Sequence, residues 1–509
     1  MVPQRPTPGN QALTHSSTAA GGADFRAAPE VAEPLAELLR HDVAGWQEHG
    51  LTRIKQRTVR RVFRGRLGDT AVHVKVFRAD TIAARARDGL RGQGKGEREA
   101  NHLLQARDAA LPAVEPLAHG YAHEGGQPCS FVVTRSVSAV PFAFPCDDAS
   151  SHAAGVLVRD VHDRGLQPGD LHPGNLLVGE RGELWLCDLT SMQRVGDLSM
   201  RRRAQGLALF CNPIDGGPLD PTTRAFLRGY LSRGAMPDGF RNELARATRQ
   251  LRATALRSFG RRSSRSCRHT DAEPRRRGQP RWFWFVDDDG VDDPLREVLA
   301  GFDPAQHQPR RSGRRGAVWL RDAFAVKDRD AGKARKLWLA HYWLRFARVP
   351  TPTPLALRLH GGRGRVFVRR LPSDDLAAEL RDGRLDDARI AACAYALGAA
   401  VGRLHGHGLR NRDLKFENLV RVDDGAALAM VDLDGVTLHG AEDTRGCGRD
   451  LGRLLAAWAD SGHPGGDATV QRFIYAYVRI RRRLLQQPPV RRILAHAERR
   501  AGEWRKRHA

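Results

Sequence analysis

The chain has 509 residues, of which 41% are hydrophobic and 28% charged, and its formal net charge is +25 at pH 7. This length is too great for a single hydrophobic core, so we expect two or three globular domains. The seven Cys stand singly, which excludes a disulfide scaffold and a C-x-x-C zinc site and favours the reducing cytoplasm. No apolar run reaches the ~18–20 residues that a membrane-spanning helix needs.

The basic excess has two interpretations. Lys and Arg number 83 against 58 Asp and Glu, and only eight of the basic residues are Lys. An Arg-rich solvated surface accounts for this composition without any function. Alternatively, a charge of this size favours anionic partners such as an acidic membrane leaflet, a phosphorylated lipid or nucleic acid.

Two stretches of the chain are poor in apolar residues. Residues 1–30 are rich in Pro, Gly, Ser and Thr, which predicts a disordered tail. Residues 256–281 are rich in Arg and Ser, which predicts an interdomain linker. The expected domains are therefore residues 31–255 and residues 282–509.

Hydrophobic periodicity predicts a similar succession of elements in both domains. In 57–77, Val72, Val74 and Val76 alternate with polar residues, which places Lys75 on the opposite face of a strand. The expected elements in chain order are a helix in 31–50, two strands in 57–77, a helix in 96–110, a strand at 131–137, a helix at 151–164, two strands in 176–188, two strands in 316–328 and two strands in 419–432.

One segment occurs twice. Residues 161–178 read VHDRGLQPGDLHPGNLLV and residues 404–421 read LHGHGLRNRDLKFENLVR. Seven positions recur at one offset of 243 residues, which indicates a duplicated unit. The recurring residues are His162, Gly165, Leu166, Asp170, Leu171, Asn175 and Leu176, which match His405, Gly408, Leu409, Asp413, Leu414, Asn418 and Leu419.

The D-x-x-x-x-N pattern inside this repeat is typical of a phosphoryl-transfer loop, in which an Asp orients the accepting hydroxyl and an Asn holds a metal ion. Such sites also need a strand Lys for the nucleotide phosphates, a helix Glu that holds this Lys, and a second Asp on the metal. The first half offers all five groups, with Glu97 as the alternative helix acid. They are Lys75, Glu99, Asp170, Asn175 and Asp188.

The second half offers four of the five groups. Lys327 is the candidate nucleotide Lys, Asp413 the candidate acceptor-orienting residue, and Asn418 and Asp432 the candidate metal ligands. Lys415 adds a charge that would neutralise the transferring phosphate. No Glu occurs between Glu297 and Glu379, so the helix partner is missing, and neither half has a full G-x-G-x-x-G loop.

These motifs resemble the bacterial lipopolysaccharide core kinases, which phosphorylate Kdo or heptose sugars and belong to the protein-kinase-like superfamily. In the first half the resemblance lies in residues 60–77, the Glu99 helix with LPAVEPLAHG (111–120), and GLQPGDLHPGNLLV. In the second half it lies in VPTPTPLAL (349–357), the catalytic loop and VDLDG. It implies an α+β fold of two tandem bilobal domains, each with a small antiparallel-sheet N-lobe and a mainly helical C-lobe.

The resemblance further implies an ATP-dependent kinase that uses Mg²⁺ and transfers the γ-phosphate to a hydroxyl of a core sugar. The expected acceptor is the anionic glycolipid at the inner face of the inner membrane, and nucleic acid is not expected as a partner. Two alternatives stay open. The motif NRDLKFEN (411–418) also fits a protein Ser/Thr kinase, and one or both halves could be pseudokinase scaffolds that bind nucleotide or lipid without turnover.

Overall fold

The structure is a computed structural model of the chain. It describes residues 13 to 483 with gaps, and a few positions beyond 483. The gaps inside that range are residues 14, 20–22, 58–59, 79–93, 213–219, 268, 287–291, 314–315, 372–373, 423–426, 441–442 and 461–466. The chain divides into a first unit, Met1–Ala247, and a second unit, Thr248–Ala509.

The first unit has a seven-stranded antiparallel sheet in the order β1-β2-β6-β7-β5-β4-β3. Strand β5 lies inside the sheet, paired on one side with β4 and on the other with β7, and Val72, Val74 and Val76 lie in the core beneath it. The strands are β1 (His15–Ala19), β2 (Ala23–Ala27), β3 (Thr52–Arg57), β4 (Arg60–Leu67), β5 (Thr70–Arg78), β6 (Pro116–Glu124) and β7 (Gln127–Arg135).

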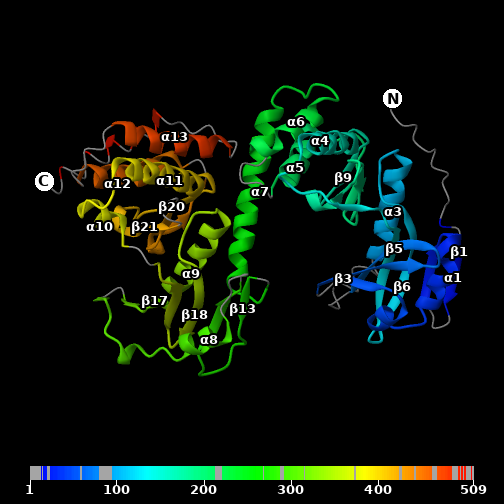
Figure 1. Ribbon diagram of the computed structural model, residues 1–509, viewed down its shortest axis with the longest axis horizontal. Coiled ribbons are helices and arrows are strands. Elements are labelled where there is room, and N and C mark those ends of the chain that lie inside the picture. Colours follow the sequence, from blue (N-terminus) through cyan, green and yellow to red (C-terminus); the bar gives the residue numbers. More distant parts are fainter. Residues whose placement is uncertain are drawn as a thin grey trace. The chain divides into compact units, whose positions relative to one another are not determined.

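The rest of the first unit is mainly helical, with short strands that carry the repeated loop (Figure 1). The helices are α1 (Pro29–Leu38), α3 (Lys95–Asp108), α4 (Asp148–Asp163), α5 (Met200–Phe210), α6 (Arg224–Leu231) and α7 (Phe240–Arg262), which continues into the second unit. The short strands are β8 (Ala139–Pro141), β9 (Leu166–Pro168), β10 (Leu176–Gly179), β11 (Leu184–Leu186) and β12 (Met192–Arg194).

The second unit repeats the sheet strand for strand, in the order β13-β14-β18-β19-β17-β16-β15. This one-to-one correspondence extends the duplication from the loop to the whole sheet lobe. The strands are β13 (Thr270–Ala272), β14 (Arg281–Phe285), β15 (Arg311–Gly313), β16 (Gly316–Leu320), β17 (Phe324–Asp330), β18 (Pro354–His360) and β19 (Arg363–Arg369).

Helices and two small two-stranded sheets, β20 with β23 and β21 with β22, complete the second unit. The helices are α8 (Asp293–Ala300), α9 (Ala331–Phe346), α10 (Leu376–Arg381), α11 (Asp387–Gly406), α12 (Thr444–Asp460) and α13 (Asp467–Arg483). The short strands are β20 (Leu409–Asn411), β21 (Leu419–Val422), β22 (Ala427–Met430) and β23 (Val436–Leu438). The predicted α+β architecture, with a sheet lobe and a helical lobe in each of two units, is therefore confirmed.

Two boundary predictions were wrong. The described part of residues 1–30, the segment expected to be disordered, contributes β1 and β2, because Phe25 and Ala27 alternate into the core while β2 pairs with β6. Residues 1–12 of that segment lie outside the described residues. The expected linker at 256–281 contains the end of α7, β13 and the start of β14. Leu256 is fully buried there, and Thr270 bonds to the Tyr342 hydroxyl at 2.6 Å. Widely spaced apolar residues are thus enough to pack a segment whose overall composition is polar.

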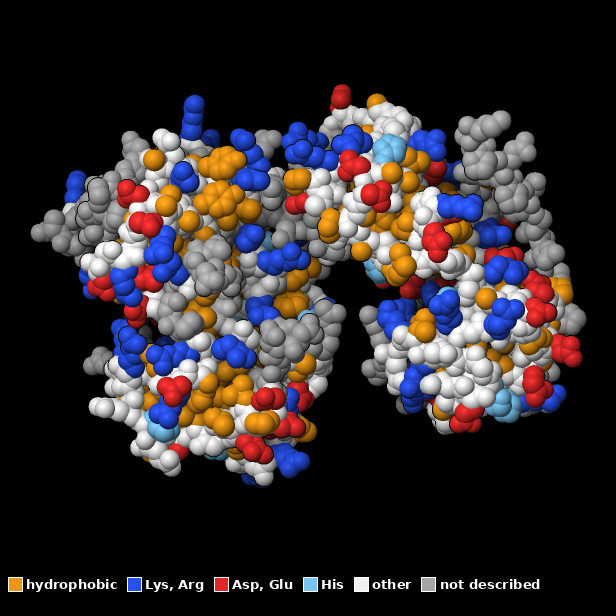
Figure 2. Space-filling view, viewed as in Figure 1, with side chains coloured by type: hydrophobic (Ala, Val, Ile, Leu, Met, Phe, Trp, Pro, Cys, Tyr) orange, Lys and Arg blue, Asp and Glu red, His pale blue; other side chains and the backbone are white. Residues whose placement is uncertain are grey.

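Basic and acidic side chains are intermingled on the surface. Figure 2 shows Lys and Arg side chains interspersed with Asp and Glu on the visible faces of both units. Among the described residues, no helix is both long and apolar enough to cross a membrane.

Candidate active sites

Strand β5 of the first sheet places Lys75 in a network of carboxylates. Its Nζ donates to Glu99 Oε1 at 2.6 Å and lies 3.6 Å from Asp188 Oδ1. Burial opposes charge on the amine, but the negative charges of Glu99 and Asp188 outweigh this effect and raise the pKa of Lys75. The Lys is therefore a fixed cation between a helix acid and the acid that follows the hairpin.

Helix α3 presents Glu99 because it packs directly on the sheet. A Cβ on Gly96 would lie 2.0 Å from the carbonyl oxygen of Phe131 in β7, so only Gly permits this approach. Glu99 is 1% exposed, and its second carboxylate oxygen accepts from the Thr190 hydroxyl at 2.9 Å. Glu97, the alternative acid, is only half-buried. The geometry therefore assigns the Lys75 contact to Glu99.

The repeated loop places Asn175 and Asp170 beside Asp188. The buried Asn175 Nδ2 donates to the carbonyl oxygens of Asp170, at 2.7 Å, and Asp188, at 3.4 Å. These bonds leave the Asn carbonyl oxygen available as a ligand. The Asp170 side chain is exposed at the mouth of the loop, where an acceptor hydroxyl can reach it.

Asp188 has a second cationic neighbour that the sequence did not single out. Arg60 of β4 donates to Asp188 Oδ2 at 2.6 Å across 128 residues of sequence. Burial favours the neutral form of Asp188, but the positive charges of Lys75 and Arg60 outweigh this effect and lower the pKa of Asp188. Arg60 is one of 75 Arg in the chain, and only its register on β4, opposite Phe77, aims it at this carboxylate.

The second unit assembles a related but different site. Lys327 of β17 donates to Asp432 Oδ1 at 2.9 Å and to the carbonyl oxygen of Val431 at 3.3 Å. Asn418 Nδ2 donates to the Asp413 carbonyl oxygen at 2.8 Å and to its Oδ2 at 3.1 Å. Lys415 Nζ lies 4.0 Å from Asp413 Oδ1. The four groups predicted for this half therefore lie on the same loop and strand arrangement as in the first unit.

Among the described residues, the helix of the second unit has no acid at the position of Glu99. Helix α9 occupies the place of α3, and both helices are followed by a residue with positive φ, Ala110 (55°) and Arg348 (51°), 238 residues apart. At that spacing Glu99 corresponds to Leu337, which is buried. The Lys327 amine therefore pairs with Asp432 directly. Burial favours the neutral form of Asp432, but Lys327 lowers its pKa.

A second ion pair distinguishes the later site. Arg329, two residues beyond Lys327, donates to Asp434 Oδ2 through Nε at 3.2 Å and through Nη2 at 2.9 Å. In the first unit the residue two positions after Asp188 is Thr190, and it bonds to Glu99 instead. Where the first unit has the helix carboxylate of Glu99, the second unit thus has the strand guanidinium of Arg329 paired with the loop carboxylate of Asp434.

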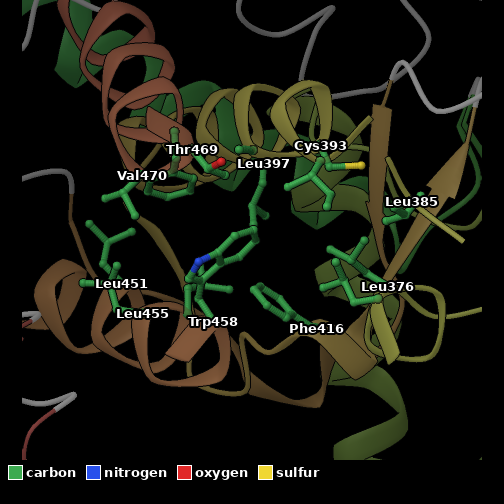
Figure 3. A pocket seen from close by; sticks show the side chains of 15 residues that line it. Leu376, Leu385, Cys393, Leu397, Phe416, Leu451, Leu455, Trp458, Thr469 and Val470 are labelled. Atoms are coloured by element: carbon green, nitrogen blue, oxygen red, sulfur yellow. The ribbon is translucent and has the colours of Figure 1, made fainter. Parts of the chain in front are cut away.

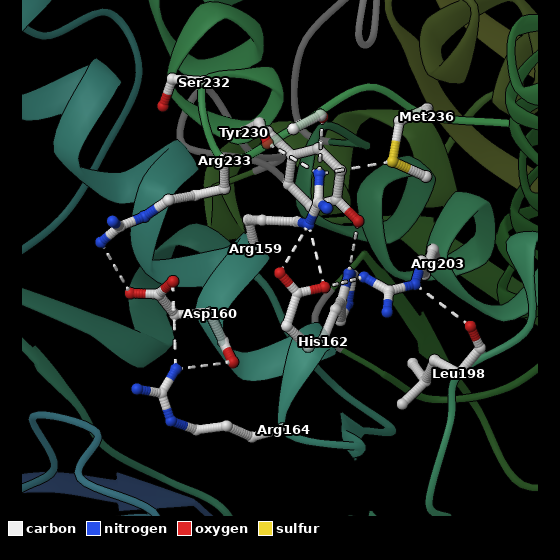
Figure 4. A network of polar contacts seen from close by, with 12 residues as sticks. Arg159, Asp160, His162, Arg164, Leu198, Arg203, Tyr230, Ser232, Arg233 and Met236 are labelled. Carbon is white, nitrogen blue, oxygen red and sulfur yellow. Dashed lines mark hydrogen bonds and ion pairs between the residues drawn. The ribbon is translucent and has the colours of Figure 1, made fainter.

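The repeated His residues support the loops. His162 Nδ1 lies 2.9 Å from the Tyr230 hydroxyl within the network of Figure 4, and His405 Nδ1 lies 3.0 Å from the Tyr477 hydroxyl. The two units differ in the group that faces the other ring nitrogen, Nε2. A Cβ on Gly206 would lie 2.7 Å from His162 Nε2, whereas Asp450 Oδ2 lies 3.4 Å from His405 Nε2.

Opposite pKa shifts follow from this difference. Burial lowers the pKa of His162 to about 3. Burial also disfavours charge on His405, but Cys447, Tyr477 and Asp450 outweigh it and raise its pKa well above the ordinary value. Asp450 further binds Arg410 at 2.9 Å, in the strand that enters the catalytic loop.

The donor sets fit a hard divalent cation. Mg²⁺ prefers carboxylate and carbonyl oxygens and usually takes one or two protein carboxylates together with phosphate oxygens and water. Asn175 with Asp188, and Asn418 with Asp432, supply such oxygens. Within the described part of the chain, no group of three or more His, Cys, Asp or Glu is arranged to hold a metal ion, so any Mg²⁺ here would depend on the nucleotide phosphates.

Comparison with known proteins adds little. No family model matches the chain, and neither does any curated protein. Among solved structures, the bifunctional kinase-methyltransferase WbdD is similar over 37% of this chain and 47% of that chain, at 16% identity and a TM-score of 0.25. The chain thus spans about half the length of that protein. A TM-score this low does not support an inference about fold or function. The kinase-like interpretation therefore depends on the strands, loops and side chains of the two units themselves.

Proposed function

We propose that this protein is an ATP-dependent phosphotransferase and that its first unit performs the transfer. The observation that carries the proposal is Lys75, held between Glu99 and Asp188 at 2.6 and 3.6 Å, with Asn175 bonded to the backbone of both Asp170 and Asp188. Phosphoryl transfer requires positioning and charge neutralisation rather than covalent chemistry by the protein. A fixed amine, two oxygen ligands and an accessible carboxylate supply those requirements.

Each group has a distinct role in this proposal. Lys75 binds the α- and β-phosphates of ATP, and Glu99 holds the amine in place. Asn175 and Asp188 hold Mg²⁺, which neutralises charge on the phosphate oxygens when bound. Asp170 accepts the proton of the acceptor hydroxyl and orients its oxygen towards the γ-phosphorus. The acceptor oxygen forms a bond to that phosphorus while the bond from the phosphorus to the bridging oxygen breaks, and ADP leaves with the electron pair of the broken bond.

We propose a sugar hydroxyl of the lipopolysaccharide core as the acceptor. The sequence resemblance supports this choice, and so does the basic surface, which attracts a phosphorylated glycolipid at an anionic leaflet. A protein Ser or Thr hydroxyl is the second candidate, which the loop NRDLKFEN in the second unit favours. Leu337, which stands where the first unit has Glu99, and the Lys327–Asp432 pair favour a weaker or purely binding role for the second unit.

The test is incubation of purified full-length protein with labelled ATP, Mg²⁺ and either core glycolipid or a protein mixture. We expect label on the sugar, and a loss of at least 100-fold in Asp170→Asn. Label on protein Ser or Thr alone would select the second candidate. Tight ATP binding without turnover on any acceptor, and equal behaviour of wild type and Asp170→Asn, would contradict the enzymatic proposal.

A further inference from the structure

The second unit contains an apolar cavity beside its catalytic loop (Figure 3). Its empty space measures about 590 Å³ when the part that is open to solvent is included. Phe416 lines it from the loop itself, between Lys415 and Asn418. The other walls come from α10, α11, α12 and α13, and include Leu376, Leu397, Leu454, Trp458 and Phe473.

The first unit fills the same place with aromatic rings. Phe210 of α5 stacks on Phe226 of α6, with ring centroids 4.8 Å apart. Phe142 and Phe144 pack against this pair, with centroids 5.9 to 6.0 Å from Phe210. These four Phe side chains therefore pack together at this place in the first unit.

The correspondence between the units is fixed by contacts. A Cβ on Gly155 would meet the Phe226 carbonyl oxygen at 1.9 Å, and a Cβ on Gly398 would meet that of Phe473 at 2.2 Å, so these two Phe are equivalent. The pairing of Leu177 with Pro141 matches that of Val420 with Asp375, so Leu376 stands where Phe142 does. Leu454 lies four residues after Asp450, just as Phe210 lies four residues after Gly206, so Leu454 stands where Phe210 does. Two Phe of the first unit are therefore Leu in the second.

The lining determines the chemistry of an occupant. No charged side chain is among the residues that line the cavity, and its polar groups are the Thr469 hydroxyl, the Cys393 thiol and the indole N–H of Trp458. A nucleotide or sugar would lose its hydrogen bonds with water there without replacement. Figure 3 shows the lining spread from Leu385 on one side to Leu451 and Val470 on the other, which suits an extended aliphatic molecule.

We propose that this cavity binds a single hydrocarbon chain, supplied by a free fatty acid or by a membrane lipid. The proposal does not depend on phosphoryl transfer, since occupancy is measured by binding alone. Because Phe416 is a wall of the cavity, an occupant contacts the loop that carries Lys415 and Asn418. The second unit would then be the part of the chain that senses or holds lipid.

The first test uses cis-parinaric acid, a fluorescent fatty acid, with the full-length protein. The double variant Leu376→Phe/Leu454→Phe copies the first unit and refills the cavity, so we expect at least a tenfold loss of probe affinity. Leu454→Met, which conserves volume, is the matched control and should bind within twofold of wild type. Undiminished binding by a folded double variant would overturn the proposal.

A second test does not require the refilled variant to fold. Trp458 lines the cavity, so a fatty acid brominated along its chain should quench its fluorescence, and Trp458→Phe should remove that part of the quenching. Vesicles of brominated phosphatidylglycerol form the parallel arm. Quenching by the free acid alone identifies a soluble source, and quenching by vesicles identifies a membrane lipid. Quenching that is unchanged in Trp458→Phe in both arms would refute the site.

Discussion

Leu337 occupies in α9 the position that Glu99 occupies in α3, 238 residues earlier. The first unit can therefore hold its strand Lys from the helix, whereas the second pairs Lys327 with Asp432 at 2.9 Å. A Lys that already neutralises the metal Asp must exchange partners before it can bind phosphate. This difference leads us to expect unequal roles for two units of equal fold.

Removal of the helix carboxylate should impair nucleotide use in the first unit. We expect Glu99→Gln to lower kcat/KM for ATP by at least tenfold, because Lys75 then pairs with Asp188 and competes with the metal. The measurement is the steady-state rate at varied ATP. Leu337→Met, a volume-conserving change in the second unit, is the control and should stay within twofold. A Glu99→Gln enzyme with unchanged ATP dependence would remove the assigned role.

The two metal Asp residues should be separable by substitution. Asp188→Asn keeps the shape of the side chain but loses its charge, so we expect Mg²⁺-dependent transfer to fall at least 100-fold while the fold persists. Asp432→Asn should affect only the second unit's nucleotide binding. Transfer rates, nucleotide binding with and without EDTA, and circular dichroism measure these effects. Metal-dependent transfer that survives Asp188→Asn would count against the first assignment, and unchanged metal-dependent nucleotide binding in Asp432→Asn would count against the second.

Arg60 should oppose metal binding at Asp188. Its guanidinium bonds to the carboxylate that is proposed to hold Mg²⁺, so Arg60→Gln should lower the Mg²⁺ concentration for half-maximal activity severalfold. Arg61→Gln is the matched control, because Arg61 pairs with Glu124, away from the site. A higher Mg²⁺ requirement in Arg60→Gln would show that the guanidinium helps to build the site.

The buried His residues predict different responses to pH. His162 has a folded pKa of about 3, so below its unfolded value of 6.5 the unfolded state binds the proton and stability declines. Between pH 6.5 and 5 this amounts to about 2 kcal/mol. Denaturant unfolding at the two pH values should show a smaller difference in His162→Asn. An equal difference in wild type and variant would contradict a neutral buried His162.

His405 should act in the opposite direction. Its raised pKa means that its charged form stabilises the fold below pH 6.5, and that this contribution is lost as pH rises through the folded pKa. We therefore expect His405→Asn to weaken the second unit most at acidic pH. The measurement is the urea midpoint of the wild-type and variant protein across pH 5 to 9. A loss of stability that is greatest at alkaline pH would exclude this account.

Much of each candidate site could be predicted from local pattern. Alternation of Val72, Val74 and Val76 with polar residues identifies a strand with one buried face, and this fixes the side on which Lys75 points. The repeat identifies the loops, because Asp and Asn at a fixed spacing after a helix recur in both halves. Local periodicity and spacing carry this information without any knowledge of distant contacts.

Other features depend on contacts that no local pattern encodes. Arg60 reaches Asp188 only through the register of β4 on β5 and the docking of the two lobes of the first unit. The place of β1 and β2 in the sheet depends on the pairing of β2 with β6, about a hundred residues later. The cavity of the second unit appears only when its Leu residues are compared with the Phe residues that occupy the same positions in the first.

Lys75 is central to the proposed function, as the amine that binds the nucleotide phosphates in the first unit. The decisive measurement is the rate of phosphate transfer from labelled ATP in Lys75→Met, with Lys333→Met, an exposed Lys paired with Asp330, as the control. We predict a loss of at least 100-fold in Lys75→Met and a rate within twofold of wild type in Lys333→Met. Transfer by Lys75→Met at the wild-type rate would contradict the proposed site.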